Sequence, residues 1–346
     1  QYDAIFFWQA SSLNRGDTTS PGLFTAGEQQ AIEEFARAGG GIAASAAAIA
    51  AASVEQIASA LRARLFRMSS LGVTTVEVKS GYGLDEAGEK KQLDAIIQVA
   101  RERDVARVVS TYLALHALPR AMADRRTEYV AAAAERVRAF AVQDLMQFVD
   151  AYVDENAFTP LEAEAIALAA AEAGVGVRLH AGQFADVGGA QLAARVGAKS
   201  ADHLEHVSRG DLEAMAASGT RAVLLPLASF TLGDPPPPVS LMRRAGVAMV
   251  VASDANPGTA PSESLPLALA LAVRAYGMTP EEALLGATRE AAFALGLGDR
   301  VGIIAPGYEA DLVLWDLPHE HAIVQPWGVS KTRAVVFAGQ KQTPRQ

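Results

Sequence analysis

The sequence has no cysteine and few histidines. Among its 346 residues, disulfides, thiolate metal sites and a cysteine nucleophile are therefore excluded. Any transition metal must instead be held by histidine, aspartate or glutamate. Only six histidines are present, so the search for ligands is short; they stand at positions 116, 180, 203, 206, 319 and 321.

Clusters of basic residues and long apolar segments are also missing. The net charge is −9, so nucleic acid is a poor candidate partner. No apolar stretch reaches the roughly 18 residues needed to span a bilayer. The first residues lack the charged and apolar segments of a signal peptide. We expect a cytoplasmic protein with a small-molecule substrate and with neither a membrane nor nucleic acid as partner.

The composition and the order of apolar segments indicate an α/β barrel. Hydrophobic residues make up 50% of the chain, enough for a large core, and the length suits a barrel of roughly 250 residues with an accessory piece. From Leu71 to Ser253, seven apolar strands alternate with helices, which predicts a TIM-like (β/α)8 barrel. The eighth strand must come from residues 1–70, where Asp3–Trp8 is the best candidate. Two helices are also predicted there, Ala31–Ala38 and Val54–Leu65, separated by Gly39–Gly41.

The segment after the barrel has a different character. One helix is predicted over residues 280–295. A turn with an apolar strand within 302–316, and a further strand at Thr332–Phe337, predict a small β domain. The expected organisation is a partial N-terminal segment of this β domain or a first strand (1–23), the barrel (24–298) and the C-terminal part of the β domain (299–346).

Polar residues follow three of the predicted barrel strands. Asp254 comes just after Val247–Ala252, an apolar run typical of a strand buried on both faces. His180 and His203 end two other strands. Barrels keep their catalytic groups at these carboxyl ends, so the three residues indicate a metal-assisted hydrolase. Asp254 is a candidate metal ligand or proton carrier, since it lies too far before the helix near Ser262 to cap it.

Further candidates lie near the same strand ends. Gln183 is placed to hydrogen-bond substrate or water but, as an amide, cannot act as a general base. His116 is a candidate substrate contact. Tyr82 either contacts substrate from its glycine-rich loop or packs on that loop, and 256–259 form either an anion-binding loop or a plain turn. The remaining histidines are weaker candidates: His206 is expected on the surface, and His319 and His321 lie in a polar segment.

Four motifs, in order along the chain, resemble the imidazolonepropionase family of the amidohydrolase superfamily. They are V-E-V-K-S-G-Y-G-L at 76–84, S-A-D-H-L-E at 200–205, A-V-L-L-P at 222–226 and D-A-N-P-G-T at 254–259. The similarity covers most of residues 32–316. It implies a distorted barrel with a composite β domain, a homodimer, and hydrolysis of the cyclic amide of 4-imidazolone-5-propanoate to N-formimidoyl-L-glutamate in histidine degradation.

The resemblance also implies a role for each matched residue. One divalent metal, zinc or iron, would be bound by His180 and Asp254, and Asp254 would relay protons as well. Gln183 matches a position near the nucleophilic water, and His203 would polarise the ring carbonyl. The other matched positions would hold the substrate: Tyr82, His116, Asn256, Gly258 and Thr259.

One feature of the family is absent. The family carries His-x-His, two metal ligands, on its first barrel strand shortly after Pro-Gly-Leu. Here Pro21-Gly22-Leu23 is followed by F-T-A-G-E, and no histidine precedes His116. Either the sequence omits a stretch at this point or the protein has no such pair. Two alternatives stay open: another cyclic-amide hydrolase or deaminase of the superfamily, and a metal-free ligand-binding barrel.

Overall fold

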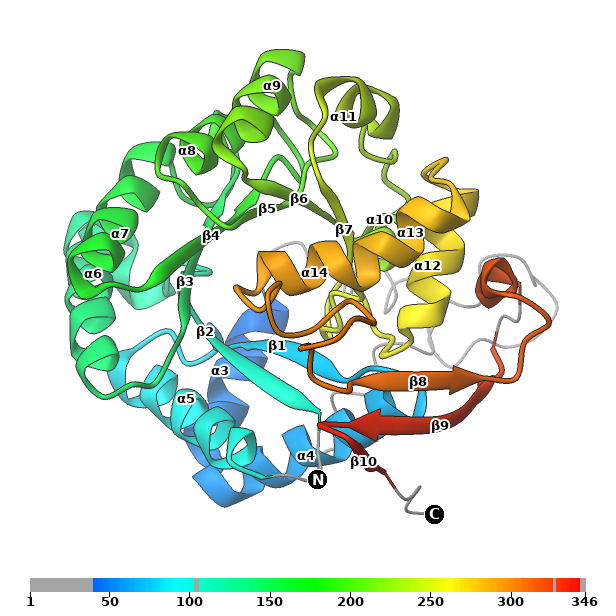
Figure 1. The fold of residues 1–346 in the computed structure, drawn as a ribbon. Coiled ribbons are helices and arrows are strands. Elements are labelled where there is room, and N and C mark those ends of the chain that lie inside the picture. Colours follow the sequence, from blue (N-terminus) through cyan, green and yellow to red (C-terminus); the bar gives the residue numbers. More distant parts are fainter. Residues whose placement is uncertain (1–39, 103–105, 326–327, 343–346) are drawn as a thin grey trace, which may run out of the picture.

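The computed structural model describes residues 40–102, 106–325 and 328–342. Its main feature is a curled sheet of seven parallel strands in sequence order, with most of the helices around the outside (Figure 1). This arrangement confirms the predicted barrel class. The strands are β1 (Thr75–Lys79), β2 (Arg107–Leu115), β3 (Phe148–Val153), β4 (Gly176–Ala181), β5 (Ser200–His203), β6 (Arg221–Leu224) and β7 (Met249–Val251).

Helices connect these strands, and several begin with a capping box, in which two side chains satisfy free N–H groups of the first turn. Thr159 and Glu162 do so for α7, and Ser208 and Asp211 for α9. The helices between and after the barrel strands are α5 (Glu86–Ala100), η3 (Arg120–Arg125), α6 (Arg126–Val142), α7 (Pro160–Ala173), α8 (Gly189–Arg195), α9 (Arg209–Ser218), α10 (Pro226–Leu232), α11 (Val239–Ala245) and α12 (Leu265–Arg274).

The core lies between the strands and this ring of helices. Its largest fully buried side chains come from both layers, among them Tyr112 of β2, Phe140 of α6 and Ile166 of α7. Seven of the nine β2 residues are buried without alternation, as expected for a parallel strand covered on both faces. Within the described ranges, no helix is both long and apolar enough to cross a membrane.

The N-terminal and C-terminal parts depart from the prediction in two places, and two predicted elements are not tested. The predicted strand Asp3–Trp8 and helix Ala31–Ala38 lie outside the described residues. The glycines at 39–41 were predicted to separate two helices, but α3 (Gly40–Ala51) already begins at Gly40, directly before α4 (Val54–Ser70). The single helix predicted over 280–295 is wrong. It is divided into α13 (Pro280–Ala287) and α14 (Arg289–Ala294).

The break between α13 and α14 coincides with the close approach of a later segment. Thr288 leaves the helical region at φ −123° and ψ −89°. Gly302, at φ +90°, approaches so closely that a Cβ there would lie 2.8 Å from the carbonyl oxygen of Thr288. After the break, α14 lies across the ring (Figure 1), and the Ala294 carbonyl at its end accepts a hydrogen bond of 3.0 Å from buried Arg178.

A second, antiparallel sheet follows the barrel, as predicted. Its strands lie in the order β10 (Gln340–Lys341), β9 (Thr332–Phe337) and β8 (Leu312–Trp315), with η4 (Glu320–Val324) between β8 and β9. Arg107 at the start of β2 pairs with Glu309 and with Asp311, each at 2.6 Å. These ion pairs fix the small sheet against the barrel. The exact division of the chain into domains stays a prediction.

Candidate active site

The three residues that carry the hydrolase prediction lie at carboxyl ends of barrel strands. His180 is the penultimate residue of β4, His203 ends β5, and Asp254 follows β7. The rings of His180 and His203 lie 5.4 Å apart between centroids. His203 (φ +80°) and Asp254 (φ +50°) both occupy the left-handed region, which is strained for residues other than glycine. Such strain persists where surrounding structure enforces it, and it concentrates at functional sites.

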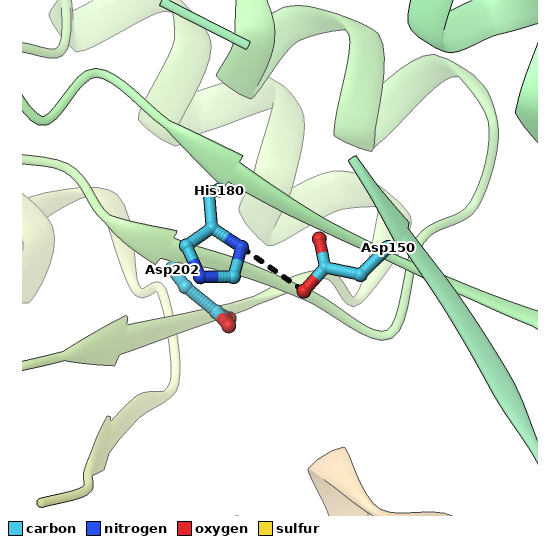
Figure 2. Close-up of side chains that lie close together, drawn as sticks. All are labelled: Asp150, His180 and Asp202. Carbon is cyan, nitrogen blue, oxygen red and sulfur yellow. Dashed lines mark ion pairs between the residues drawn. The ribbon is translucent and has the colours of Figure 1, made fainter. Parts of the chain in front are cut away.

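A charged cluster surrounds His180. Asp150 of β3 and Asp202 of β5 flank His180, and one donor atom from each of the three lies within 4.8 Å of the others (Figure 2). The Lys79 ammonium pairs with Asp150 at 2.5 Å and with Asp202 at 3.0 Å. The two carboxylates are therefore already neutralised by a cation from β1.

The register of the sheet explains why these groups meet. Tyr152, His180 and Asp202 are paired in register across β3, β4 and β5. Residues in register on neighbouring parallel strands point to the same face. Arg178, two residues before His180, pairs with Glu77 of β1 at 3.0 Å and lies 3.7 Å from Asp202, which extends the cluster toward the amino ends of the strands.

Electrostatics keep this cluster charged. Although burial opposes it, His180 and Lys79 hold the pKa of Asp150 well below its ordinary value. Against the same burial, Asp150 and Asp202 raise the pKa of Lys79. At the strand ends burial dominates: it lowers the pKa of His203 to about 3, with His180 adding to the effect, and it raises the pKa of Asp254 to about 6.

The donors near His180 fit a divalent metal. Nδ1 of His180 lies 3.0 Å from a carboxylate oxygen of Asp150, so the ring is turned to leave Nε2 for another partner. A carboxylate behind a ligating histidine is the usual support of a metal ligand. Asp254 interacts electrostatically with His180, and its carboxylate would offer a hard oxygen donor. Lys79 fills the space between the other two carboxylates.

Gln183 lies beside the histidines on the segment after β4. Its side-chain oxygen accepts a hydrogen bond of 3.0 Å from the Tyr152 hydroxyl, and the Tyr152 ring lies 6.0 Å from that of His180. The Gln183 N–H donates to Asp154 at 2.8 Å, and the same carboxylate accepts from the next two N–H groups. The segment is therefore rigidly placed next to His180.

Tyr82 and His116 come together at the ends of β1 and β2. Their rings meet edge to face with centroids 4.9 Å apart. Nδ1 of His116 lies 2.8 Å from the Gly81 carbonyl, and since a carbonyl only accepts, Nδ1 carries the hydrogen. Burial lowers the pKa of His116 to about 4. The free Nε2 of this neutral ring is thus a hydrogen-bond acceptor.

The loop after Asp254 is held mainly by one side chain. The Asn256 oxygen accepts from the N–H groups of Gly258 and Thr259 at 2.8 and 2.7 Å, and its NH2 donates to the Asp254 carbonyl at 2.7 Å. Those two N–H groups are occupied within the loop, so the plain turn explains them better than an anion-binding loop. The same bonds fix the backbone of Asp254.

The other histidines lie elsewhere. His206 is exposed, as predicted. His321 pairs with Glu281 at 3.0 Å, and its ring lies 5.8 Å from that of His319.

The sequence prediction missed the five charged residues of the cluster. The sequence did contain a signal for these residues, because a charge inside an apolar strand is rarely buried unless it is paired. The five residues lie within or at the end of β1, β3, β4 and β5: Glu77, Lys79, Asp150, Arg178 and Asp202.

Comparison with known proteins agrees with this geometry. Residues 29–343 match the model of the amidohydrolase family. An imidazolonepropionase of Paracoccus denitrificans is 44% identical over 90% of this chain and 78% of that protein. One of Pseudomonas aeruginosa is 46% identical over 82% and 71%.

Solved structures with a similar fold are more distant in sequence. A zinc-bound adenosine deaminase of Xanthomonas campestris superposes with a TM-score of 0.64 at 21% identity, over 84% of this chain and 71% of that one. An atrazine chlorohydrolase of Arthrobacter aurescens, complexed with zinc and atraton, does so with a TM-score of 0.66 at 18% identity, over 82% and 71%. At such identities the likeness concerns the fold alone.

Proposed function

Because this chain belongs to the amidohydrolase family, we propose that it is a hydrolase of a cyclic amide and, like the imidazolonepropionases it resembles, converts 4-imidazolone-5-propanoate to N-formimidoyl-L-glutamate. The reaction adds one water across the ring C–N bond. The observation that carries the proposal is the placement of His180, His203 and Asp254 at the carboxyl ends of three barrel strands, with strained backbone at two of them. We propose the substrate from the 42–46% identity to imidazolonepropionases.

We assign a zinc or iron ion to Nε2 of His180 and the carboxylate of Asp254. When bound, the ion supplies Lewis-acid activation of water near neutral pH. Asp150 orients His180 for this role through its contact with Nδ1 at 3.0 Å. Catalytic zinc usually has three protein ligands, so the proposal needs a further donor beyond these two.

Three side chains of the site carry out proton transfer, stabilisation of the developing charge and binding of the water. Asp254 takes a proton from the attacking water and returns it to the leaving ring nitrogen, as a general base and then a general acid. His203 donates an N–H to the ring carbonyl oxygen, where negative charge develops. Gln183 hydrogen-bonds the water without taking its proton.

We propose that the substrate lies between this group and the ends of β1 and β2. Tyr82 and His116 present an aromatic edge and a free Nε2 acceptor there, which suits a heterocycle with N–H donors. The family resemblance adds Asn256, Gly258 and Thr259 to the binding face, although the N–H groups of Gly258 and Thr259 are already bonded to Asn256. A cytoplasmic location and a homodimer belong to the proposal through the family resemblance, and sedimentation would test the dimer.

One experiment decides between the three functions. Purified protein is weighed by intact mass spectrometry, its metal content is measured on the same sample, and 4-imidazolone-5-propanoate is supplied. About one zinc or iron per chain, with a product heavier by one water, is expected. If the protein instead turns over hydantoins, dihydropyrimidines or aminated heterocycles, it is another cyclic-amide hydrolase or a deaminase. Binding without metal or turnover would favour a ligand-binding barrel.

A further inference from the structure

Glu205 lies two residues beyond His203 and is nearly inaccessible to solvent, with a side chain only 2% exposed. One carboxyl oxygen, Oε1, accepts a hydrogen bond of 2.6 Å from the Ser229 hydroxyl. Oε2 faces Nδ1 of His203 at 3.8 Å. The role proposed above for His203 does not account for this buried acid.

The backbone brings the two side chains to face each other. His203 and Leu204 both have left-handed φ values, +80° and +67°. The Leu204 N–H donates to the Ala181 carbonyl at 3.1 Å, and the His206 N–H donates to that of Gly182 at 2.8 Å. Gly182 itself approaches the His206 carbonyl too closely for any Cβ, which would lie at 2.2 Å. Contacts with the end of β4 therefore hold this turn, which follows β5, in place.

The two facing atoms are both buried and unpaired. Neither Nδ1 of His203 nor Oε2 of Glu205 has a hydrogen-bond partner among the described residues. Buried polar atoms without partners are costly and rare in folded proteins. Catalytic hydrogen bonds are often long in the free enzyme and shorten when substrate binds, and a small rotation of either side chain closes 3.8 Å to bonding range.

The surrounding hydrogen bonds of the described residues leave Oε2 of Glu205 free, and the role proposed for His203 decides which of the two facing atoms donates. Ser229 gives its only hydrogen to Glu205, so the Tyr276 hydroxyl, 2.5 Å away, must donate to Ser229. If a neutral His203 is to donate from Nε2 to a carbonyl, Nδ1 is a bare acceptor. A carboxylate oxygen opposite a bare nitrogen would repel it, whereas a carboxylic acid would bond to it.

We propose that Glu205 is a positioning residue for His203: in its acid form it donates its O–H to Nδ1, which keeps the ring hydrogen on Nε2, facing the substrate carbonyl. Burial raises the pKa of Glu205 to about 7, and Asp234 and Asp254 add to the rise. The facing of the two atoms stands on these contacts alone, while the tautomer and its use in catalysis rest on the proposed function.

The test compares two replacements of Glu205. Glu205→Gln keeps an N–H donor for Nδ1 and an acceptor for Ser229, whereas Glu205→Leu removes both. Because a misdirected oxyanion donor costs on the order of 100-fold in kcat, we expect Glu205→Leu to lower kcat at least about tenfold with KM changed less than about threefold. Glu205→Gln should stay within about threefold of the original kcat. Glu213→Gln and Glu213→Leu, on the exposed face of α9, are the matched controls.

Nitrogen NMR of histidine-labelled protein provides a readout that needs no turnover. The Nδ1 resonance of His203 should be that of an unprotonated acceptor in the original protein and in Glu205→Gln, and it should shift in Glu205→Leu. If Glu205→Leu does not fold, Ser229→Ala serves in its place and should also shift the resonance. If the protein does not turn over the proposed substrate, the NMR result can still be interpreted.

Two outcomes would overturn the inference. One is a hydrogen found on Nδ1 of His203 in the original protein. The other is the same kcat and the same His203 resonances in the Leu and Gln variants.

Discussion

The loops that follow β1 and β5 both leave the sheet through left-handed residues, but the buried glutamates beside them, Glu89 and Glu205, are paired differently. After β1, buried Glu89 accepts N–H hydrogen bonds from Gly81, Gly83 and Leu84 at 2.7 to 2.8 Å. After β5, His203 and Glu205 keep buried polar atoms without hydrogen-bond partners in the described structure. Satisfied groups contribute stability, whereas unsatisfied ones cost it and are kept where a ligand will complete them.

The contrast implies that the two regions should respond differently to mutation. Changes in the strand-end site should remove activity at little cost in stability, and changes in the loop after β1 should do the reverse. Active sites commonly show this trade-off.

The largest effect is expected at Asp254. Asp254→Asn keeps the shape but removes the proton carrier and the anionic donor, so kcat should fall by about 10³-fold or more. Because burial already disfavours the Asp254 carboxylate, the midpoint of thermal unfolding should stay level or rise. Steady-state kinetics and calorimetry on one preparation measure both. A variant with near-normal turnover would refute the assignment.

The second-largest effect is expected for Lys79→Met. It leaves Asp150 and Asp202 buried without their shared cation, and breaking a buried ion pair from one side typically costs about 3–5 kcal/mol. We expect the free energy of unfolding in urea to fall by that order, with activity lost as well. The double variant Lys79→Met/Asp150→Asn should recover part of the stability. If Lys79→Met alone is as stable as the original, the cluster is not an energetic unit.

Glu89→Ala tests the opposite region. Three backbone N–H groups lose their acceptor, and leaving buried donors unpaired costs about 1–3 kcal/mol each before water enters. A loss of roughly 3 kcal/mol in unfolding free energy is expected. Tyr82 and His116 move with this loop, so KM should rise while kcat changes less. An unchanged unfolding midpoint would contradict the stabilising role given to Glu89.

The smallest effect is expected at Glu162, remote from both loops. Its hydrogen bonds with Arg126 lower the pKa of Glu162 to about 2. A lowered pKa stabilises the fold above the ordinary value of 4.5, and this contribution is lost as the pH falls through about 2. Glu162→Gln should therefore cost about 1 kcal/mol at neutral pH and nearly nothing at the acid end. Unfolding curves across that range would show a constant difference if the inference were wrong.

Much of the architecture could be predicted from the order of apolar segments. The parallel sheet, the helix Pro160–Ala173 and the strand Thr332–Phe337 were all placed correctly, because periodicity and capping residues are local signals. The break at Thr288 was missed, since it depends on the approach of Gly302 from a later segment. The roles of the individual site residues stay predictions until they are tested.

The sequence by itself determined which strands end in chemically useful residues. His180, His203 and Asp254 each follow an apolar run, and parallel strands bring their carboxyl ends to one edge. Only the tertiary structure decided what surrounds them. Lys79 reaches Asp150 and Asp202 across 71 and 123 residues of chain, and Glu205 faces His203 because two left-handed residues turn the backbone. The register of neighbouring strands and the strain of a turn are set by packing, which no local pattern encodes.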